Sequence, residues 1–167
     1  MKLRIGLISD THGLLRQEAL DALAGSDRIV HAGDIGGAHI LEALQAIAPV
    51  TAVRGNNDAG AWAHALPEAI TLHAGEVAVH VLHDVKALRR DPHAHGYRVV
   101  IAGHSHRPLV QERSAILYVN PGSAGPRRFS LPVSVARLDI DGAVVQATIE
   151  LLHVVGSPVQ TVRSTRR

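Results

Sequence analysis

The chain lacks cysteine and has few aromatic residues. None of its 167 residues is cysteine, which excludes disulfides, thiolate zinc sites, iron–sulfur clusters and a cysteine nucleophile. Only four aromatic side chains are present: Trp62, Tyr97, Tyr118 and Phe129. So few rings offer little for stacking unpaired bases, and we do not expect nucleic acid to be the main partner.

Long hydrophobic runs and a strong charge are also missing. No apolar stretch approaches the roughly 20 residues that span a bilayer, and the first apolar run is short and leads into Asp10. That start lacks the organisation of a signal peptide, so we expect a cytoplasmic protein without membrane contact. The net charge is +2, and the last fifteen residues carry three arginines and no acid. A basic surface on the folded body, which nucleic-acid binding needs, is therefore not indicated.

Hydrophobic patterning predicts a layered α/β sandwich. Short apolar runs at 3–8, 28–32 and 50–53 are typical of buried strands, and residues 14–24 and 38–47 between them have helical spacing. This order predicts parallel strands with right-handed crossovers. Later residues read mostly as strands, at 69–73, 77–82, 98–102, 107–112, 115–119, 132–139 and 143–152. We expect one domain over residues 1–155 and a basic, flexible tail at 156–167.

Histidine is abundant, with 12 residues. Several histidines and other possible metal ligands come directly after predicted strands. Seven of the side chains that follow five predicted strands can bind a metal: Asp10, His12, Asp34, Asn56, His83, His104 and His106. In open α/β sheets, ligands bind beyond the carboxyl ends of the strands. Oxygen and imidazole ligands suit Mn, Ni, Fe, Zn or Mg, of which manganese is our first choice.

Seven ligands exceed the need of one divalent ion and satisfy two ions if one carboxylate bridges them. Asp34 is the natural bridging residue because it is the single candidate ligand after the predicted strand at 28–32. Two such ions, roughly 3.5–4 Å apart, clamp a phosphoryl group and lower the pKa of a shared water. The sequence therefore predicts attack of a metal-bound hydroxide on phosphorus.

The order of these motifs resembles the calcineurin-like metallophosphoesterase superfamily over about residues 1–140. The motifs are Asp10-x-His12, Gly33-Asp34, Gly55-Asn56-x-Asp58, His83 and Gly103-His104-Ser105-His106. The short chain and the later Asn120-Pro121-Gly122-Ser123 are similar to its small YfcE-like phosphodiesterase branch. The resemblance implies two packed mixed β-sheets flanked by helices, and a small phosphoester as substrate.

The resemblance also implies roles for single residues. One metal ion would take Asp10, His12, Asp34 and His106, and the other Asp34, Asn56, His83 and His104. Asn56 and His104 are the expected catalytic residues, and the expected substrate contacts are Asn57, Arg54 and Arg127, with Arg128 beside them. Asn120 is considered for a supporting role near the site.

The chain departs from the family pattern at two positions near the site. Larger relatives have a histidine that assists the leaving group where this chain has Asn57, and a neutral amide cannot act as a general acid. Asp84 follows His83 where the family usually has glycine, so a further carboxylate near the second ion is considered.

Other interpretations remain open for several residues and for the chain as a whole. His80 competes with His83 as a ligand, although residues three apart on a strand point to opposite faces. His31 is expected to pack under the site. The chain as a whole could instead be a non-catalytic, Vps29-like protein-interaction scaffold, or a phosphomonoesterase or nuclease using the same site. Assembly into a homo-oligomer is left open.

Overall fold

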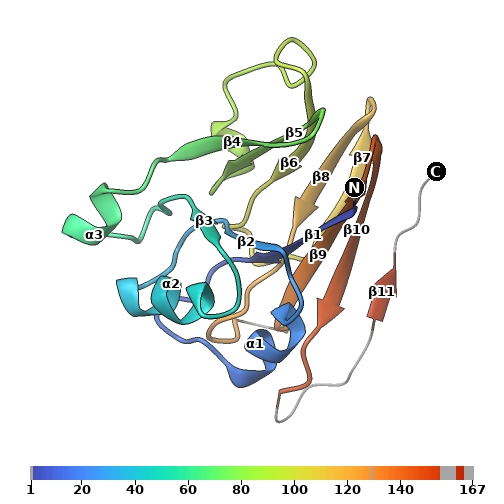
Figure 1. The fold of residues 1–167 in the computed structure, drawn as a ribbon. Coiled ribbons are helices and arrows are strands. Elements are labelled where there is room, and N and C mark those ends of the chain that lie inside the picture. The colour runs from blue at the N-terminus through green and yellow to red at the C-terminus, as the bar shows by residue number, and fades with distance from the viewer. Residues whose placement is uncertain (1, 129, 155–160, 164–167) are drawn as a thin grey trace.

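Two β-sheets pack face to face in the computed structural model, which describes residues 2–128, 130–154 and 161–163 (Figure 1). The six-stranded sheet has the order β11 (Thr161–Arg163), β10 (Val144–Leu151), β9 (Ser134–Asp141), β1 (Lys2–Ile8), β2 (Arg28–His31), β3 (Val50–Ala52). The five-stranded sheet has the order β4 (Ala69–Ala74), β5 (Val77–Leu82), β6 (Tyr97–Ile101), β8 (Ile116–Asn120), β7 (Leu109–Arg113). Both sheets mix parallel and antiparallel pairs, which confirms the predicted sandwich of two mixed sheets.

Helices connect the first three strands. β1, β2 and β3 pair in parallel, as predicted, through α1 (Gln17–Leu23) and α2 (Ala38–Gln45). Both helices lie against the outer face of the six-stranded sheet (Figure 1). Helix α1 starts three residues later than its apolar spacing predicts, because Arg16 still has an extended backbone. A further helix, α3 (Ala61–His64), was not predicted, since four residues show no helical period.

The later strands form hairpins at the predicted turns. β4 and β5 pair antiparallel around Gly75 and Glu76, and β9 and β10 do so around Asp141 and Gly142. A short 3₁₀ helix, η1 (Val85–Ala87), lies at the start of the segment that connects β5 to β6. In the second half, strands therefore follow one another as predicted.

Side chains that alternate along the central strands form two hydrophobic cores. In β1, Leu7 packs between the two sheets, and its neighbour Ile8 packs beneath the helices. The core between the sheets takes side chains from both, among them Val79, Ile101 and Leu138. Burial on both faces explains why β1 and β2 read as continuous apolar runs, and it fixes the strand ends that carry the site.

Of the tail predicted at 156–167, only strand β11 lies within the described residues, where it pairs antiparallel with β10. The remaining tail positions lie outside them. Within the described part of the chain, no helix has both the length and the hydrophobicity that crossing a membrane requires.

We predict that Leu138→Ala lowers the free energy of unfolding by about 2–5 kcal/mol, because it removes a fully buried side chain between the sheets and leaves a cavity. Val144→Ala is the matched control, since Val144 is 70% exposed, and it should change stability by less than about 0.5 kcal/mol. Urea unfolding measures both. Equal losses in the two variants would contradict the described core.

Candidate metal centre

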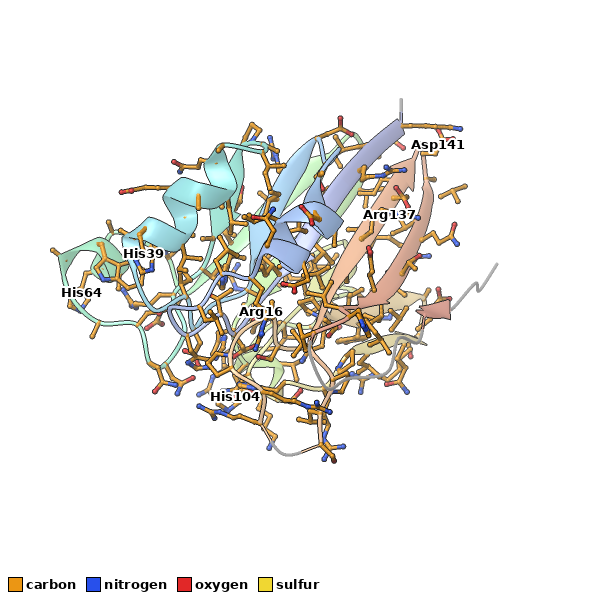
Figure 2. All side chains as sticks on the ribbon, turned by 90° about the horizontal axis from the view of Figure 1, so that it is seen from below. Arg16, His39, His64, His104, Arg137 and Asp141 are labelled. Carbon is orange, nitrogen blue, oxygen red and sulfur yellow. The ribbon has the colours of Figure 1, made fainter. Side chains whose placement is uncertain are left out.

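The loops after β1, β2, β3, β5 and β6 bring the seven predicted ligands together at one end of the sandwich. Functional atoms of five of them, Asp10, His12, Asp34, His83 and His106, form a connected set with neighbours 3.3–3.9 Å apart. His104 lies within 4.8 Å of Asp34 and His83 and contacts Asn56 at 3.2 Å. The β9–β10 turn at Asp141 lies at the far end of the molecule from His104 (Figure 2). The carboxyl ends of strands from both sheets therefore bring the candidate ligands to one place.

One group of ligand atoms comes from Asp10, His12 and His106, and these atoms all lie within 4.8 Å of one another. Asp10 Oδ1 is 3.3 Å from His106 Nε2 and 3.8 Å from His12 Nε2. The two imidazole Nε2 atoms are 3.4 Å apart. A carboxylate oxygen and two ring nitrogens thus face the same small volume.

A second group comes from Asp34, His83 and His104, whose ligand atoms also lie within 4.8 Å of one another. His83 Nε2 is 3.3 Å from Asp34 Oδ2. The Nδ1 of His104 is 3.2 Å from Asn56 Oδ1, so the Asn56 amide adjoins this group. Because Asp34 Oδ2 is also 3.8 Å from His12 Nε2, the Asp34 carboxylate lies between the two groups.

The backbone is strained where it presents these side chains. Among the described residues, seven other than glycine have a positive φ, and five of them are predicted ligands: Asp10, His12, Asp34, His104 and His106. Such conformations cost of the order of 1–2 kcal/mol each for residues with a Cβ atom. They persist only where the surrounding structure holds them, and they concentrate at functional sites.

Hydrogen bonds orient the ligands and leave specific atoms free. His83 Nδ1 is 2.7 Å from the carbonyl oxygen of Ala32; a carbonyl can only accept, so Nδ1 carries the hydrogen and Nε2 has a free lone pair. Asp10 Oδ2 accepts hydrogen bonds from Ser9 Oγ at 2.7 Å and from the His104 N–H at 3.1 Å. Ligands of metal ions in proteins are commonly fixed in this way.

Two of the remaining atoms, Asp10 Oδ1 and His83 Nε2, are buried and have no hydrogen-bond partner. Buried polar atoms in native proteins almost always have one. A divalent cation is the partner that suits a carboxylate oxygen and an imidazole lone pair facing the same space. The donor set therefore fits bound metal ions.

The ionisation of Asp34 and His12 agrees with this fit, whereas at His83 burial is outweighed by the neighbouring Asp34 and by a backbone carbonyl, which raise the pKa. Burial acts to raise the pKa of Asp34, but the adjacent His83 imidazole and a hydrogen bond from the Asn57 N–H outweigh it and hold that pKa well below its usual range. Burial lowers the pKa of His12, and the charge of Arg128 adds to this effect. An ionised carboxylate and a neutral imidazole are the forms that bind metal.

Asp58 joins two of the ligand loops, a role that the sequence analysis did not assign. Its Oδ1 accepts hydrogen bonds from the N–H groups of Ile35 and Gly36 at 2.8 and 3.0 Å, and its Oδ2 accepts from the Gly55 N–H at 2.9 Å. These bonds fix the loop that holds Asp34 against the loop that holds Asn56.

The segment 120–123 supports the loops after β6 and β1. Asn120 Nδ2 donates to the carbonyl oxygen of Gly103 at 2.9 Å and to Ser105 Oγ at 3.0 Å. Ser123 Oγ donates to the Asp10 carbonyl oxygen at 3.0 Å. Asn120 therefore has the supporting contacts that its motif suggested.

His31 and His80 lie outside both ligand groups. His31 is fully buried beneath the site, where its Nδ1 accepts from the Gly33 N–H at 3.1 Å and burial lowers its pKa to about 3. His80 stacks on Tyr97 with ring centroids 4.4 Å apart. Its place away from the ligand groups agrees with the predicted alternation along β5.

The three expected substrate contacts, Asn57, Arg54 and Arg127, lie in different surroundings. Asn57 donates to the two oxygens of Asp34, from its N–H at 2.9 Å and from Nδ2 at 3.0 Å. Arg54 Nη2 pairs with Glu68 at 2.9 Å, which draws its guanidinium toward the start of β4. Arg127 is exposed in the loop after Ser123.

Asp84, the departure after His83, adjoins His104. Its Oδ2 is 3.7 Å from His104 Nε2, and its Oδ1 accepts from the Lys86 N–H at 3.0 Å. The carboxylate lies outside both ligand groups, so it faces the side of His104 that is turned away from Asn56.

Comparison with known proteins gives a consistent result. Residues 3–143 match the calcineurin-like phosphoesterase superfamily domain. A "Probable metallophosphoesterase" of Methanothermobacter thermautotrophicus is 33% identical over an alignment of 157 positions that covers 87% of this chain and 90% of that protein.

Two solved structures share the fold. Vps29 from Entamoeba histolytica in complex with zinc has a TM-score of 0.79 and 22% identity, covering 97% of this chain and 98% of its own. An archaeal phosphodiesterase has a TM-score of 0.73 and 21% identity, covering 88% and 99%. At these identities the likeness concerns the fold alone.

We predict that Asp58→Ala lowers the free energy of unfolding by at least about 2 kcal/mol, because three backbone N–H groups lose their acceptor. Asp91→Ala is the control: among the described residues, this exposed carboxylate accepts only from the His93 N–H at 3.1 Å. Urea unfolding in EDTA separates the loss of loop bonds from any loss of metal. An Asp58 variant as stable as the Asp91 variant would show that these bonds do not hold the loops.

Proposed function

Because the chain belongs to the calcineurin-like phosphoesterase superfamily, we propose that it is a binuclear, metal-dependent phosphodiesterase. The observation that carries this proposal is the pair of ligand groups at one end of the sandwich, with the Asp34 carboxylate between them. The archaeal phosphodiesterase of the same fold supports the choice of diesters. The zinc complex of Vps29 supports a divalent ion in this fold.

In this proposal each ion has four protein ligands. Asp10, His12 and His106 would hold one ion, His83, His104 and Asn56 would hold the other, and the Asp34 carboxylate would serve both. His83 uses Nε2 because Nδ1 is committed to the Ala32 carbonyl. Manganese is the proposed metal, with nickel, iron, zinc and magnesium as the other candidates, since all accept oxygen and imidazole ligands.

Divalent ions held by these residues would supply Lewis acidity, which lowers the pKa of a water molecule and offsets the charge of the phosphoryl oxygens. The protein's own groups position the ester. His104 and Asn56 are both exposed, so they are the ligands that an entering phosphate meets, and an imidazole there can donate a hydrogen bond to the charge that develops on its oxygens. Asn57 is bound to Asp34 and fixes the proposed bridge. Arg127 remains a proposed phosphate contact.

The proposal favours catalysis over a Vps29-like scaffold. All seven positions of the ligand set are present, and the free atoms of Asp10 and His83 are buried without another partner. A scaffold needs neither feature, since its partners contact exposed surfaces. Phosphomonoesters remain the second candidate substrate class for the same site.

We expect metal-stripped protein to hydrolyse bis-p-nitrophenyl phosphate only after Mn²⁺ is added, and calorimetry to find two ions per chain. Asp34→Asn should lower the rate at least about 100-fold and reduce the number of bound ions, because it weakens the proposed bridge. Asp141→Asn, an exposed carboxylate beside Lys2 at the far end of the molecule, is the control and should keep both. An Asp34 variant that behaves like the control, or no hydrolysis with Mn²⁺, Ni²⁺ or Zn²⁺, would refute the proposed function.

We further expect the rate to fall steeply as the pKa of the leaving alcohol rises, because the amide of Asn57 cannot protonate it. A series of substituted aryl methyl phosphates measures this slope. Asn57→His supplies an acid and should flatten the slope, whereas Asn57→Gln keeps an amide and should not. A flat slope in the unaltered protein would mean that another residue acts as the acid.

A further inference from the structure

A cavity adjoins the metal centre on the outer face of the five-stranded sheet. Its volume is about 640 Å³, and it lies between β6, β7, β8 and the segment that contains η1. Pockets for small molecules usually have volumes of roughly 300–1,000 Å³. No function described above uses this cavity.

The cavity opens onto the same loop that carries the metal ligands. Gly103, His104 and Ser105 line it, and the ligand groups already include His104. Asp84, 3.7 Å from His104 Nε2, lines the cavity as well. An ester whose phosphate lies against His104 and Asn56 would therefore have one substituent next to the cavity.

Part of the lining of the cavity is apolar and contains an aromatic ring. Its side chains include Val100, Ala102, Leu109, Tyr118 and Leu131. Arg113 covers the Tyr118 ring at 4.1 Å from its centroid. Four large hydrophobic side chains are exposed among the described residues, and two of these, Val85 and Leu109, line this cavity. Such a wall favours a flat, apolar group over water.

The rim of the cavity is cationic. Lys86, Arg107 and Arg113 line it, against one acidic side chain, Asp84. Lys86 and Arg107 make no ion pair with any described residue. The balance of charge at the rim suits a ligand that carries an anionic group beyond its ring.

We propose that this cavity binds the ring-bearing substituent of the phosphodiester, with an anionic group of that substituent at Lys86 and Arg107. The inference rests on the proposed function, because the phosphate must lie at the metal centre for the substituent to enter the cavity. It narrows the substrate class to diesters with one aromatic or similarly flat group.

The test compares non-hydrolysable phosphonates by calorimetry on the Mn²⁺-loaded protein. Phenylphosphonate should bind at least about tenfold more tightly than methylphosphonate, because its ring leaves water for the apolar wall. 4-Carboxyphenylphosphonate should bind more tightly still. Since binding needs no turnover, the result does not depend on which ester the protein hydrolyses.

Two variants and one control locate the effect. Leu109→Asp places a charge on the apolar wall and should remove the preference for the phenyl group while methylphosphonate binds as before. Lys86→Gln should remove only the gain from the carboxylate. Val144→Asp is the matched control, a valine at the start of β10 that is 70% exposed, and it should leave all three affinities unchanged.

The outcomes separate the two proposals. If methylphosphonate binds but phenylphosphonate binds no tighter, the cavity proposal fails and the proposed function stands. If neither phosphonate binds, both fail. Equal weakening of both phosphonates by Leu109→Asp, or a change of oligomeric state in light scattering of that variant, would also overturn the cavity proposal, since the wall would then support the metal site or a second copy of the chain.

Discussion

The convergence of two buried carboxylates with four imidazole rings is the constraint on which the rest of the site depends. Asp10 Oδ1 lies 3.3–3.9 Å from three ring nitrogens and yet has no hydrogen-bond partner. A protein that buries such atoms without a cation loses their hydration and gains no compensating bond. Metal binding would resolve this conflict, and in the proposed function the geometry of the loops serves to hold ligands for cations.

That requirement accounts for the local strain and for the network of bonds around it. Positive φ angles at five ligands are unfavourable one by one. They are held by Asp58, Asn120 and Ser123, which bind the loop backbones to one another. Gly33 shows how tightly the parts fit, because a Cβ atom there would lie 2.7 Å from His83 Nδ1. Much of the packing near the strand ends therefore serves to position the ligands.

The strands, and the convergence of the seven candidate ligands at one end of the sandwich, could be predicted from the sequence because they depend on local patterns. Apolar runs mark buried strands, and parallel strands bring the residues after them to one edge. The supporting bonds could not be predicted, since the three N–H groups that Asp58 binds come from two different loops. The pairing of Arg54 with Glu68 likewise depends on the path of the chain before β4. The cavity beside His104 depends on how η1, β7 and β8 pack, which no single segment encodes.

The central claim is that two metal ions share Asp34. Anomalous diffraction at the manganese edge, from crystals grown with Mn²⁺, tests it most directly. The account predicts two peaks, one bounded by Asp10, His12 and His106 and the other by Asn56, His83 and His104, each next to a carboxylate oxygen of Asp34. A single peak, or a pair of peaks that Asp34 does not join, would contradict it.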